Sequence, residues 1–449
     1  MATSGATLKK ESLLLERLAE ARKRTDDIFA LLTPNAYYDR PIRERHRLIF
    51  YLGHLEAFDW NLLAGPLGLV SRAPELDKLF AFGIDPVDGG LPTDEPKDWP
   101  TIAVVEQYRR DVRGRIDEAL RVQDISTSKD GYLADGTLLH VAIEHRLMHA
   151  ETLAYLLHNV QVDRKIAQPA PAEDDRRAPS NRSVAIPSGI ATLGQKRAAG
   201  GFGWDNEFDT QQVLVPEFSI DAFPVTNADY LRFMEDGGYE TQRYWRAEDW
   251  AWLKQDGVTH PHFWSASGTP DAENPEQRWN FRMMFGSIGL PLSWPVYVSH
   301  AEASAYAKWA GKKLPTEEQW HRAAYGTPEG RERSYPWGEE EPEAAHGNFH
   351  HQRWDPSGVH DHPEGASAFG IFDLLGNGWE WTSTPFAPLP GFEPYPFYKG
   401  YSADFFDGKH YVMKGGSART DSCMLRRSYR NWFQSHYPYV YGSFRCVEE

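Results

Sequence analysis

The sequence predicts a multidomain protein of the α and α+β classes, with a helical bundle first and a mixed domain after it. The chain has 449 residues, more than one ordinary hydrophobic core accommodates. Apolar residues recur at helical spacing from residue 8 to about 162. A polar, proline-rich stretch follows, and the periodicity then largely ends. We therefore expect a bundle over 1–167, a linker over 168–183 and a second domain over 184–449.

The N-terminal part contains separate amphipathic segments of helical length, joined by loops. They cover residues 8–32, 44–65, 101–123 and 136–160. Each has apolar side chains at the spacing of one helical face, so each must bury that face against a neighbour. Long helices in this order favour a four-helix bundle.

The C-terminal part shows short strand-like segments at 184–194 and 212–226. One helix is clear at 299–311, with Ser299 as its N-cap. Gly, Pro, Trp and Asn punctuate the remaining sequence, which indicates much irregular backbone. We expect an α+β domain here.

Composition excludes several classes of function. Lys and Arg total 48 against 64 Asp and Glu, and no basic run is present, so we expect no nucleic-acid partner. No apolar stretch approaches the ~20 residues that span a bilayer, so we expect no membrane role. The N-terminus lacks the apolar core of a signal peptide. The only cysteines are Cys423 and Cys446, which suits a reducing cytoplasm. The oligomeric state is not indicated.

Two histidines, His145 and His149, are spaced by one turn in the fourth segment, so both imidazoles lie on one helical face. Metal sites in bundles take further ligands from facing helices, and His54 in the second segment is the best candidate. Three neutral imidazoles suit Zn, Fe, Cu or Ni, and ligand type alone does not choose among them. The alternative for the pair is two solvated or hydrogen-bonded histidines.

This histidine pattern resembles the DinB-type bundle of the sulfoxide synthases of ergothioneine and ovothiol biosynthesis. The C-terminal part resembles the formylglycine-generating-enzyme (sulfatase-modifying) domain, whose fold is related to C-type lectins. The motifs are KKLPTEEQWHRAAYG at 312–326, YPWGEE at 335–340, FGIFDLLGNGWEWTST at 369–384, KGGS at 414–417 and GSFRCVEE at 442–449. We read their residues as structural, with Gly376 and Asn377 in a tight turn and Trp379 and Trp381 in the core.

Formylglycine-generating enzymes use a pair of cysteines just after the GGS motif. Cys423 falls at neither of the two expected positions, so we do not expect that chemistry. A three-histidine bundle fused to such a domain resembles the ergothioneine enzymes instead. The resemblance implies that the bundle carries the metal ligands and the second domain supplies substrate-binding residues.

The resemblance also implies the reaction. The cofactor would be Fe²⁺, with O₂ as co-substrate. The enzyme would join a thiol to the imidazole of Nα-trimethylhistidine (hercynine) and oxidise the sulfur to a sulfoxide. Other readings stay open: an ovothiol-type or selenoneine-type C–S or C–Se synthase, a DinB-type zinc thiol transferase or hydrolase, or a non-catalytic lectin-like binding protein.

Substrate residues follow from the same resemblance. Asn431 and Trp432 match the family's substrate-binding strip and would contact the trimethylated histidine. Either Tyr398 or Tyr401, in the FYKGYSADFFDG stretch, would donate a proton near the oxygen-binding position.

This chain departs from the family pattern at residues that bear on the choice of thiol. Many relatives carry an acidic residue directly after this tryptophan, whereas this chain has Phe433, followed by Gln434. Met148 stands at a position where Gln is common. These departures favour free cysteine over γ-glutamylcysteine. Arg110 and Arg113 are candidates for binding the carboxylate of a substrate.

Overall fold

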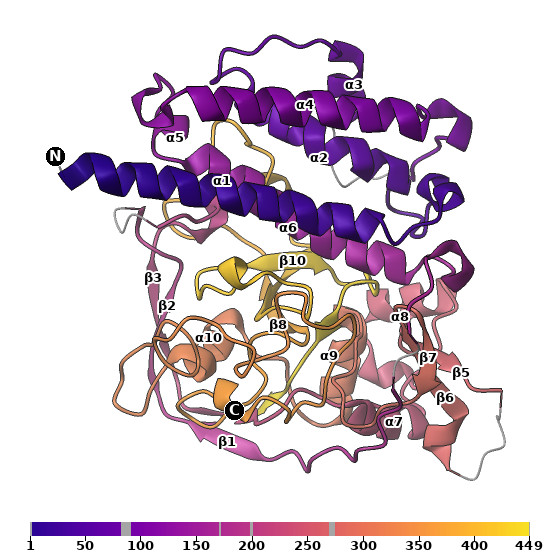
Figure 1. Ribbon diagram of the computed structural model, residues 1–449. Coiled ribbons are helices and arrows are strands. Elements are labelled where there is room, and N and C mark those ends of the chain that lie inside the picture. Colours follow the sequence, from indigo (N-terminus) through magenta and orange to yellow (C-terminus); the bar gives the residue numbers. More distant parts are fainter. Residues whose placement is uncertain (1, 82–90, 170–171, 198–200, 269–273, 449) are drawn as a thin grey trace. The chain divides into compact units, whose positions relative to one another are not determined.

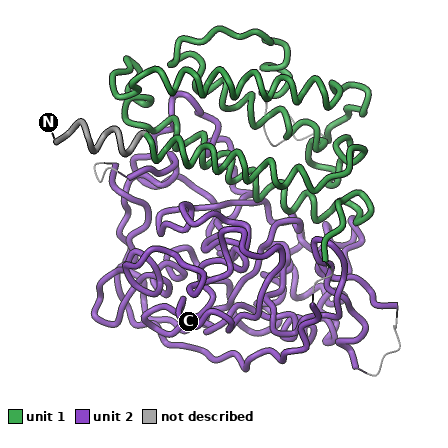
Figure 2. The backbone as a smooth tube through the Cα atoms, viewed as in Figure 1, with its two compact units in different colours: residues 1–169 green, residues 170–449 purple. Residues whose placement is uncertain are grey.

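The computed structural model describes residues 2–81, 91–169, 172–197, 201–268 and 274–448. The chain divides into two compact units, residues 1–169 and 170–449 (Figure 2). None of the described helices is long and apolar enough to cross a membrane.

Unit 1 is a helical bundle (Figure 1), which confirms the expected helical N-terminal part. Its long helices are α1 (Ala2–Phe29), α2 (Leu48–Leu63), α4 (Ile102–Val122) and α6 (Thr137–His158). Shorter helices are α3 (Pro74–Leu79) and α5 (Gly131–Ala134), and 3₁₀ turns cover Pro34–Tyr38, Pro96–Asp98, Ile125–Thr127 and Val162–Arg164. Helix α1 packs mainly on α6, and α2 packs on α4 and α6.

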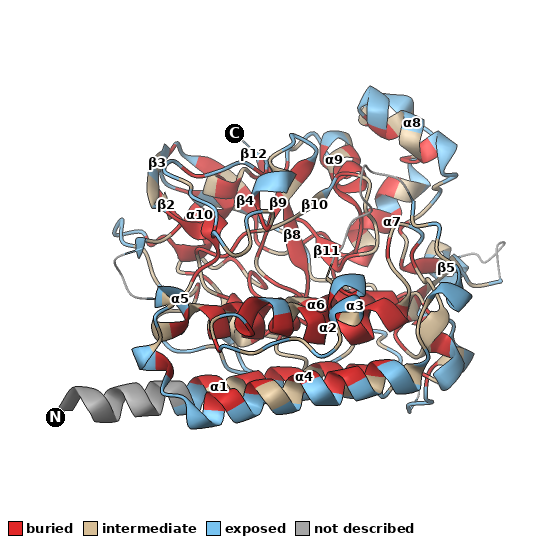
Figure 3. Ribbon diagram, turned by 90° about the horizontal axis from the view of Figure 1, so that it is seen from above, coloured by how far each residue is buried: buried red, intermediate tan, exposed pale blue. Residues whose placement is uncertain are grey.

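Helices α2 and α6 are buried along almost their whole length (Figure 3). Gly136, at φ 86°, turns the chain into α6 with a conformation that favours glycine. Polar side chains inside such helices must find partners or ligands within the fold, because water does not reach them.

Unit 2 contains several small sheets. The strands are β1 (Ser183–Ile186), β2 (Gly189–Leu193), β3 (Gln211–Val215), β4 (Phe218–Asp221), β5 (Trp264–Ala266), β6 (Trp279–Met283), β7 (Gly286–Gly289), β8 (Trp379–Pro385), β9 (His410–Lys414), β10 (Asn431–Gln434), β11 (Gly442–Ser443) and β12 (Val447–Glu448). Their orders are β1-β4-β12, β10-β9-β8-β11, β2-β3 and β5-β6-β7. The first four strands match the expected strand-like segments.

The helices of unit 2 are α7 (Asn227–Glu235), α8 (Ala247–Gln255), α9 (His300–Trp309) and α10 (Glu317–Tyr325). Ser299 caps α9 by accepting a hydrogen bond from the Glu302 amide, as expected. Helices α7, α8 and α10 are each 9 residues long, and they are additional to the one helix that the sequence marks clearly.

The turn at Gly376 and Asn377 has the structural role expected from the sequence. Gly376 and Asn377 have φ angles of 90° and 63°. The Asn377 amide donates to the Ser357 carbonyl at 2.9 Å, and Trp381 donates to the Val298 carbonyl at 2.9 Å. Trp379 and Trp381 are both buried. These contacts hold one end of β8, the central strand pairing with β9.

The polar stretch expected to be a linker makes hydrogen bonds within unit 2. Asp174 accepts from the Trp294 indole at 2.8 Å, and Glu173 accepts from the Gly289 amide at 3.0 Å. Arg176 also pairs with Asp361. At least these residues are part of the folded unit.

Candidate active site

Helices α2 and α6 bring together the histidines that the sequence singles out. One possible ligand atom from each of His54, His145 and His149 lies within 4.8 Å of the others. The centroid of the His54 ring is 5.3 Å from that of His145 and 5.0 Å from that of His149. The predicted set is therefore one compact cluster within unit 1.

Hydrogen bonding leaves nitrogens of this cluster available for a metal. The Nδ1–H of His54 donates to the Phe80 carbonyl at 2.7 Å, since a carbonyl can only accept. Its Nε2 atom has no hydrogen-bond partner among the described residues, and the same holds for both ring nitrogens of His149. Buried nitrogens without partners are costly unless something binds them.

Burial also sets the charge of these rings. It lowers the pKa of His54 to about 4 and the pKa values of His145 and His149 well below the usual value. The imidazoles are therefore neutral near pH 7, which is the form that binds metals. The donor set fits a transition metal ion, and the Phe80 carbonyl acts as an outer partner that fixes the tautomer of one ligand.

Strand β10 of unit 2 carries the predicted substrate strip. Trp432 stacks on Phe386, with ring centroids 4.2 Å apart and planes at 6°. It also meets the edges of Tyr401 and Phe405, at 5.4 Å and 5.6 Å. Of the predicted residues, Trp432 and Tyr401 are thus in direct ring contact.

Residues 432 and 433 point to opposite faces of the sheet, because side chains alternate along a strand. Phe433 stacks on Tyr437, with centroids 5.4 Å apart and planes at 8°. Asn431 shares the face of Phe433, and its side-chain oxygen Oδ1 accepts a hydrogen bond from the Trp432 backbone amide at 2.9 Å. Gln434 is exposed on the face of Trp432.

The tyrosine-bearing loop packs on the segment around Trp204. Tyr401 stacks on Trp204 at a centroid distance of 3.9 Å, and Tyr398 lies 5.5 Å from Tyr401. Burial, with the nearby Asp205, raises the pKa of Tyr398 to about 12, and burial raises the pKa of Tyr401 further. Both phenols keep their protons near neutral pH.

The remaining predicted residues lie in unit 1. Met148 is half-buried on α6, and its carbonyl accepts from the Thr152 hydroxyl. Arg113 on α4 pairs with Asp26 and Glu56. Arg110 is exposed and donates to Gln107 at 2.9 Å. Arg113 therefore has carboxylate partners of its own within the bundle.

One polar group beside β10 was not predicted from the sequence. His436 pairs with Asp249 at 2.7 Å and stacks on Trp252. Arg246 binds the same carboxylate and donates to the Ser435 hydroxyl at 3.1 Å. Arg246 and Asp249 belong to α8 and its start, far from β10 in sequence, and no local motif marks them.

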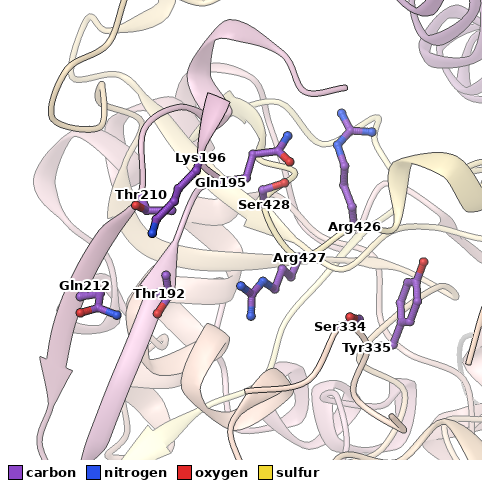
Figure 4. A pocket seen from close by; sticks show the side chains of 10 residues that line it. All are labelled: Thr192, Gln195, Lys196, Thr210, Gln212, Ser334, Tyr335, Arg426, Arg427 and Ser428. Carbon is purple, nitrogen blue, oxygen red and sulfur yellow. The ribbon is translucent and has the colours of Figure 1, made fainter. Parts of the chain in front are cut away.

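A wide groove in unit 2 is polar and cationic (Figure 4). It encloses about 960 Å³. Its walls are Thr192, Gln195, Lys196, Thr210, Gln212, Ser334, Tyr335, Arg426, Arg427 and Ser428. None of the predicted site residues lines it, so it is not part of the predicted site.

The fold and the site define a class: a DinB-type bundle with a three-histidine metal centre, in one chain with a sulfatase-modifying-factor-like domain. Residues 17–153 match the DinB superfamily, and residues 168–449 match the sulfatase-modifying factor enzyme 1-like domain. The hercynine oxygenase of Mycolicibacterium smegmatis is 35% identical over 369 residues, which covers 80% of this chain and 80% of that protein.

A second hercynine oxygenase agrees with this assignment, and a formylglycine-generating enzyme is similar to part of the chain. The hercynine oxygenase of Mycolicibacterium thermoresistibile is 37% identical over 306 residues, covering 67% of this chain and 66% of that protein. The formylglycine-generating enzyme of Mycobacterium tuberculosis is 30% identical over 239 residues, covering 47% of this chain and 76% of that protein. The chain belongs to the hercynine oxygenase family, a family of oxidoreductases.

Proposed function

We propose that this protein is an iron(II)- and O₂-dependent sulfoxide synthase that joins a thiol to the imidazole of hercynine. The observation that carries the proposal is the buried, neutral cluster of His54, His145 and His149 in a chain similar to named hercynine oxygenases. Zinc binds such a cluster but has no redox chemistry. Iron and copper both react with O₂, and the similarity to hercynine oxygenases favours iron.

The overall reaction balances with O₂ alone as oxidant. A thiol and the imidazole each lose one hydrogen, and a carbon–sulfur bond forms between them. One oxygen atom becomes the sulfoxide oxygen, and the other leaves as water with the two hydrogens. Bound iron(II) would supply the redox step with O₂. The protein holds the reactants near one another, which replaces a rare encounter by a bound geometry.

The aromatic group around Trp432 suits the trimethylammonium of hercynine. Quaternary ammonium ions bind the faces of such rings. Phe386, Tyr401 and Phe405 surround the half-buried Trp432. We assign Asn431 and Trp432 to hercynine binding, and we keep the exposed Gln434 as a contact at the end of the strip.

Tyr401 is our preferred proton donor, with Tyr398 as the alternative. Its phenol keeps its proton near neutral pH, and its ring contacts Trp432. A protonated phenol at this point can deliver a proton to the reacting oxygen, which would favour sulfoxide synthesis over simple oxidation of the thiol.

Free cysteine is our preferred thiol. The stacked rings of Phe433 and Tyr437 offer no carboxylate to the remote ammonium of γ-glutamylcysteine. The carboxylate of cysteine lies close to its sulfur, where Arg110 is the candidate partner. Arg113 is the weaker candidate because it already binds Asp26 and Glu56. Met148, on the ligand-bearing helix, would border this substrate.

An oxygen electrode tests the proposal. Anaerobically reconstituted iron protein is mixed with hercynine and cysteine, and O₂ uptake is followed with each substrate omitted in turn. We expect uptake that needs both substrates, with a sulfoxide as product by mass spectrometry. Turnover with zinc and without O₂ would instead identify a DinB-type transferase or hydrolase. Binding without turnover would identify a lectin-like protein.

A further inference from the structure

A cluster of buried and half-buried charges lies beside the histidines in unit 1. Its members are Arg22, Asp26, Glu56, Asp59, Arg109, Arg113 and Arg146, and they come from α1, α2, α4 and α6. Arg146, Glu56 and Asp59 each have an exposed fraction of 0%. Fully buried charges are rare in proteins and need specific partners.

Arg146 joins the two helices that carry the metal ligands. It follows His145 directly on α6, and its guanidinium donates to three groups on α2. The Nη2 group donates to Asp59 Oδ2 at 2.7 Å, to the Leu55 carbonyl at 2.9 Å and to Glu56 Oε2 at 3.0 Å. Nη1 donates to Glu56 Oε1 at 3.2 Å. The contacts on α2 begin one residue after His54.

Glu56 receives a second cation from α4. Arg113 donates to Glu56 Oε1 through Nη2 at 2.7 Å and through Nε at 3.0 Å. The bonds between the Glu56 carboxylate and both arginines are charge-assisted.

Such a network specifies geometry more than it adds stability. Desolvation of buried charges offsets much of their attraction, whereas a shifted helix leaves charges unpaired at large cost. A slip of one turn would move a helix by about 5.4 Å. Metal–nitrogen bonds are about 2.0–2.1 Å long for zinc, so a centre built from two helices cannot absorb such a slip.

We propose that Arg146 and Glu56 are positioning residues for the metal centre: they hold α2 and α6 in the register at which His54 meets His145 and His149. The inference rests on the metal site of the proposed function, and it is independent of hercynine, the thiol and O₂. It assigns a role to the residue directly after His145 and to the residue two positions after His54.

Cobalt(II) binding to the full-length protein tests this role, because Co²⁺ is stable in air and its absorption bands report ligand geometry. The variants are Arg146→Met and Glu56→Gln. We expect both to lower Co²⁺ affinity by about 10–100-fold, measured by competition with a chelator, as for other outer partners of metal ligands. The Co²⁺ bands should shift or weaken as well.

The matched control is Arg109→Met. Arg109 is also a buried arginine of the cluster, with an exposed fraction of 7%. Its hydrogen bonds go to Asp26 on α1 and to Glu106 on its own helix, and its Nε lies 3.6 Å from Glu56 Oε1, which is beyond hydrogen-bond distance. We expect its Co²⁺ affinity to stay within about threefold of the unaltered protein, even where its unfolding temperature falls as much as that of Arg146→Met.

Arg146→Lys keeps the charge but loses the fork of donors, so its affinity should fall between those of Arg146→Met and the unaltered protein. It also serves if Arg146→Met does not fold. Unchanged affinity and bands in Arg146→Lys and Glu56→Gln would overturn the inference. Failure of the unaltered protein to bind Co²⁺ would overturn the metal centre itself. Co²⁺ binding without hercynine-dependent O₂ uptake by the iron protein would contradict only the proposed reaction.

Discussion

His54 donates its Nδ1–H to the carbonyl of Phe80 at 2.7 Å, and this bond fixes which ring nitrogen can bind a metal. Phe80 ends the short helix α3, and its ring is fully buried. The close approach depends on Gly53, the residue before His54. A Cβ atom placed on Gly53 would lie 2.6 Å from ring atoms of Phe80.

Gly53→Ala should therefore weaken the metal centre. The Phe80 ring must move, and the carbonyl that orients His54 moves with it. We expect metal affinity to fall about tenfold and the free energy of unfolding to fall by about 1–3 kcal/mol. Gly65→Ala is the control, since a Cβ there meets nothing within 4 Å. Equal Co²⁺ affinities for the two variants would contradict this account.

His145→Ala should abolish stoichiometric iron binding after anaerobic reconstitution, because it removes one of three ligands from a site that offers no obvious replacement. His140→Ala, on the same helix but half-buried and outside the cluster, should keep its iron. Iron per chain is measured by elemental analysis. Full iron content and turnover in His145→Ala would show that the ligand set is wrong.

The bundle and the histidine cluster were predictable because both depend on a local rule. Helical periodicity marks the long helices, and a spacing of four puts His145 and His149 on one face. His54 was harder, because its partner helix is far away in sequence. It was nevertheless recognisable as a histidine among apolar residues on a neighbouring bundle helix.

The contacts around the substrate strip were not predictable, because they join distant segments. Asp249 reaches His436 across 187 positions of sequence. The pairing of Phe433 with Tyr437 depends on how the chain turns after β10, and that turn carries no strong motif. The charged cluster around Arg146 was not predictable either, because its members come from α1, α2, α4 and α6.

Asp205 should make stability depend on pH. It is buried beside the tyrosine loop and accepts from the Ser402 hydroxyl, and burial raises its pKa to about 6. In the unfolded chain the Asp205 carboxyl has the ordinary pKa of about 3.9, so only the folded state keeps this proton between the two pKa values. Stability contributed by Asp205 is therefore lost as the pH rises from about 4 to 6.

Asp205→Asn removes this titration and keeps an acceptor for Ser402. The free energy of unfolding of the variant, relative to that of the unaltered protein, should rise by about 1–3 kcal/mol between pH 4 and 6. Above that range the difference should stay constant. Urea unfolding of both proteins at several pH values measures the difference. A difference that does not vary with pH would rule out a raised pKa for Asp205.

Tyr401→Phe should shift the product from sulfoxide toward the sulfinic acid of the thiol, because the proton donor is lost while the metal ligands stay. We expect iron content to be unchanged and the product ratio to move by about tenfold or more, in line with the usual contribution of a general acid. Tyr398→Phe is the matched comparison. If neither variant nor the double variant alters the ratio, the proton comes from another group.

The proposed preference for cysteine rests on the ring pair beside β10. Phe433 and Tyr437 stack on each other at 5.4 Å and carry no carboxylate that could pair with an ammonium group. γ-Glutamylcysteine would place its remote ammonium there at a cost of roughly 1–3 kcal/mol. That cost corresponds to about tenfold to a hundredfold in kcat/KM. Cysteine avoids it, because its charges lie close to its sulfur.

Competition between the two thiols in one reaction, read by mass spectrometry, tests this preference. We expect the cysteine product to dominate. Phe433→Asp supplies a carboxylate at that position, and it should move the product ratio toward the γ-glutamyl adduct by about tenfold or more. Phe433→Leu removes the ring without adding charge, and it should leave cysteine dominant. A dominant γ-glutamyl product from the unaltered protein would show that its ammonium finds a partner elsewhere.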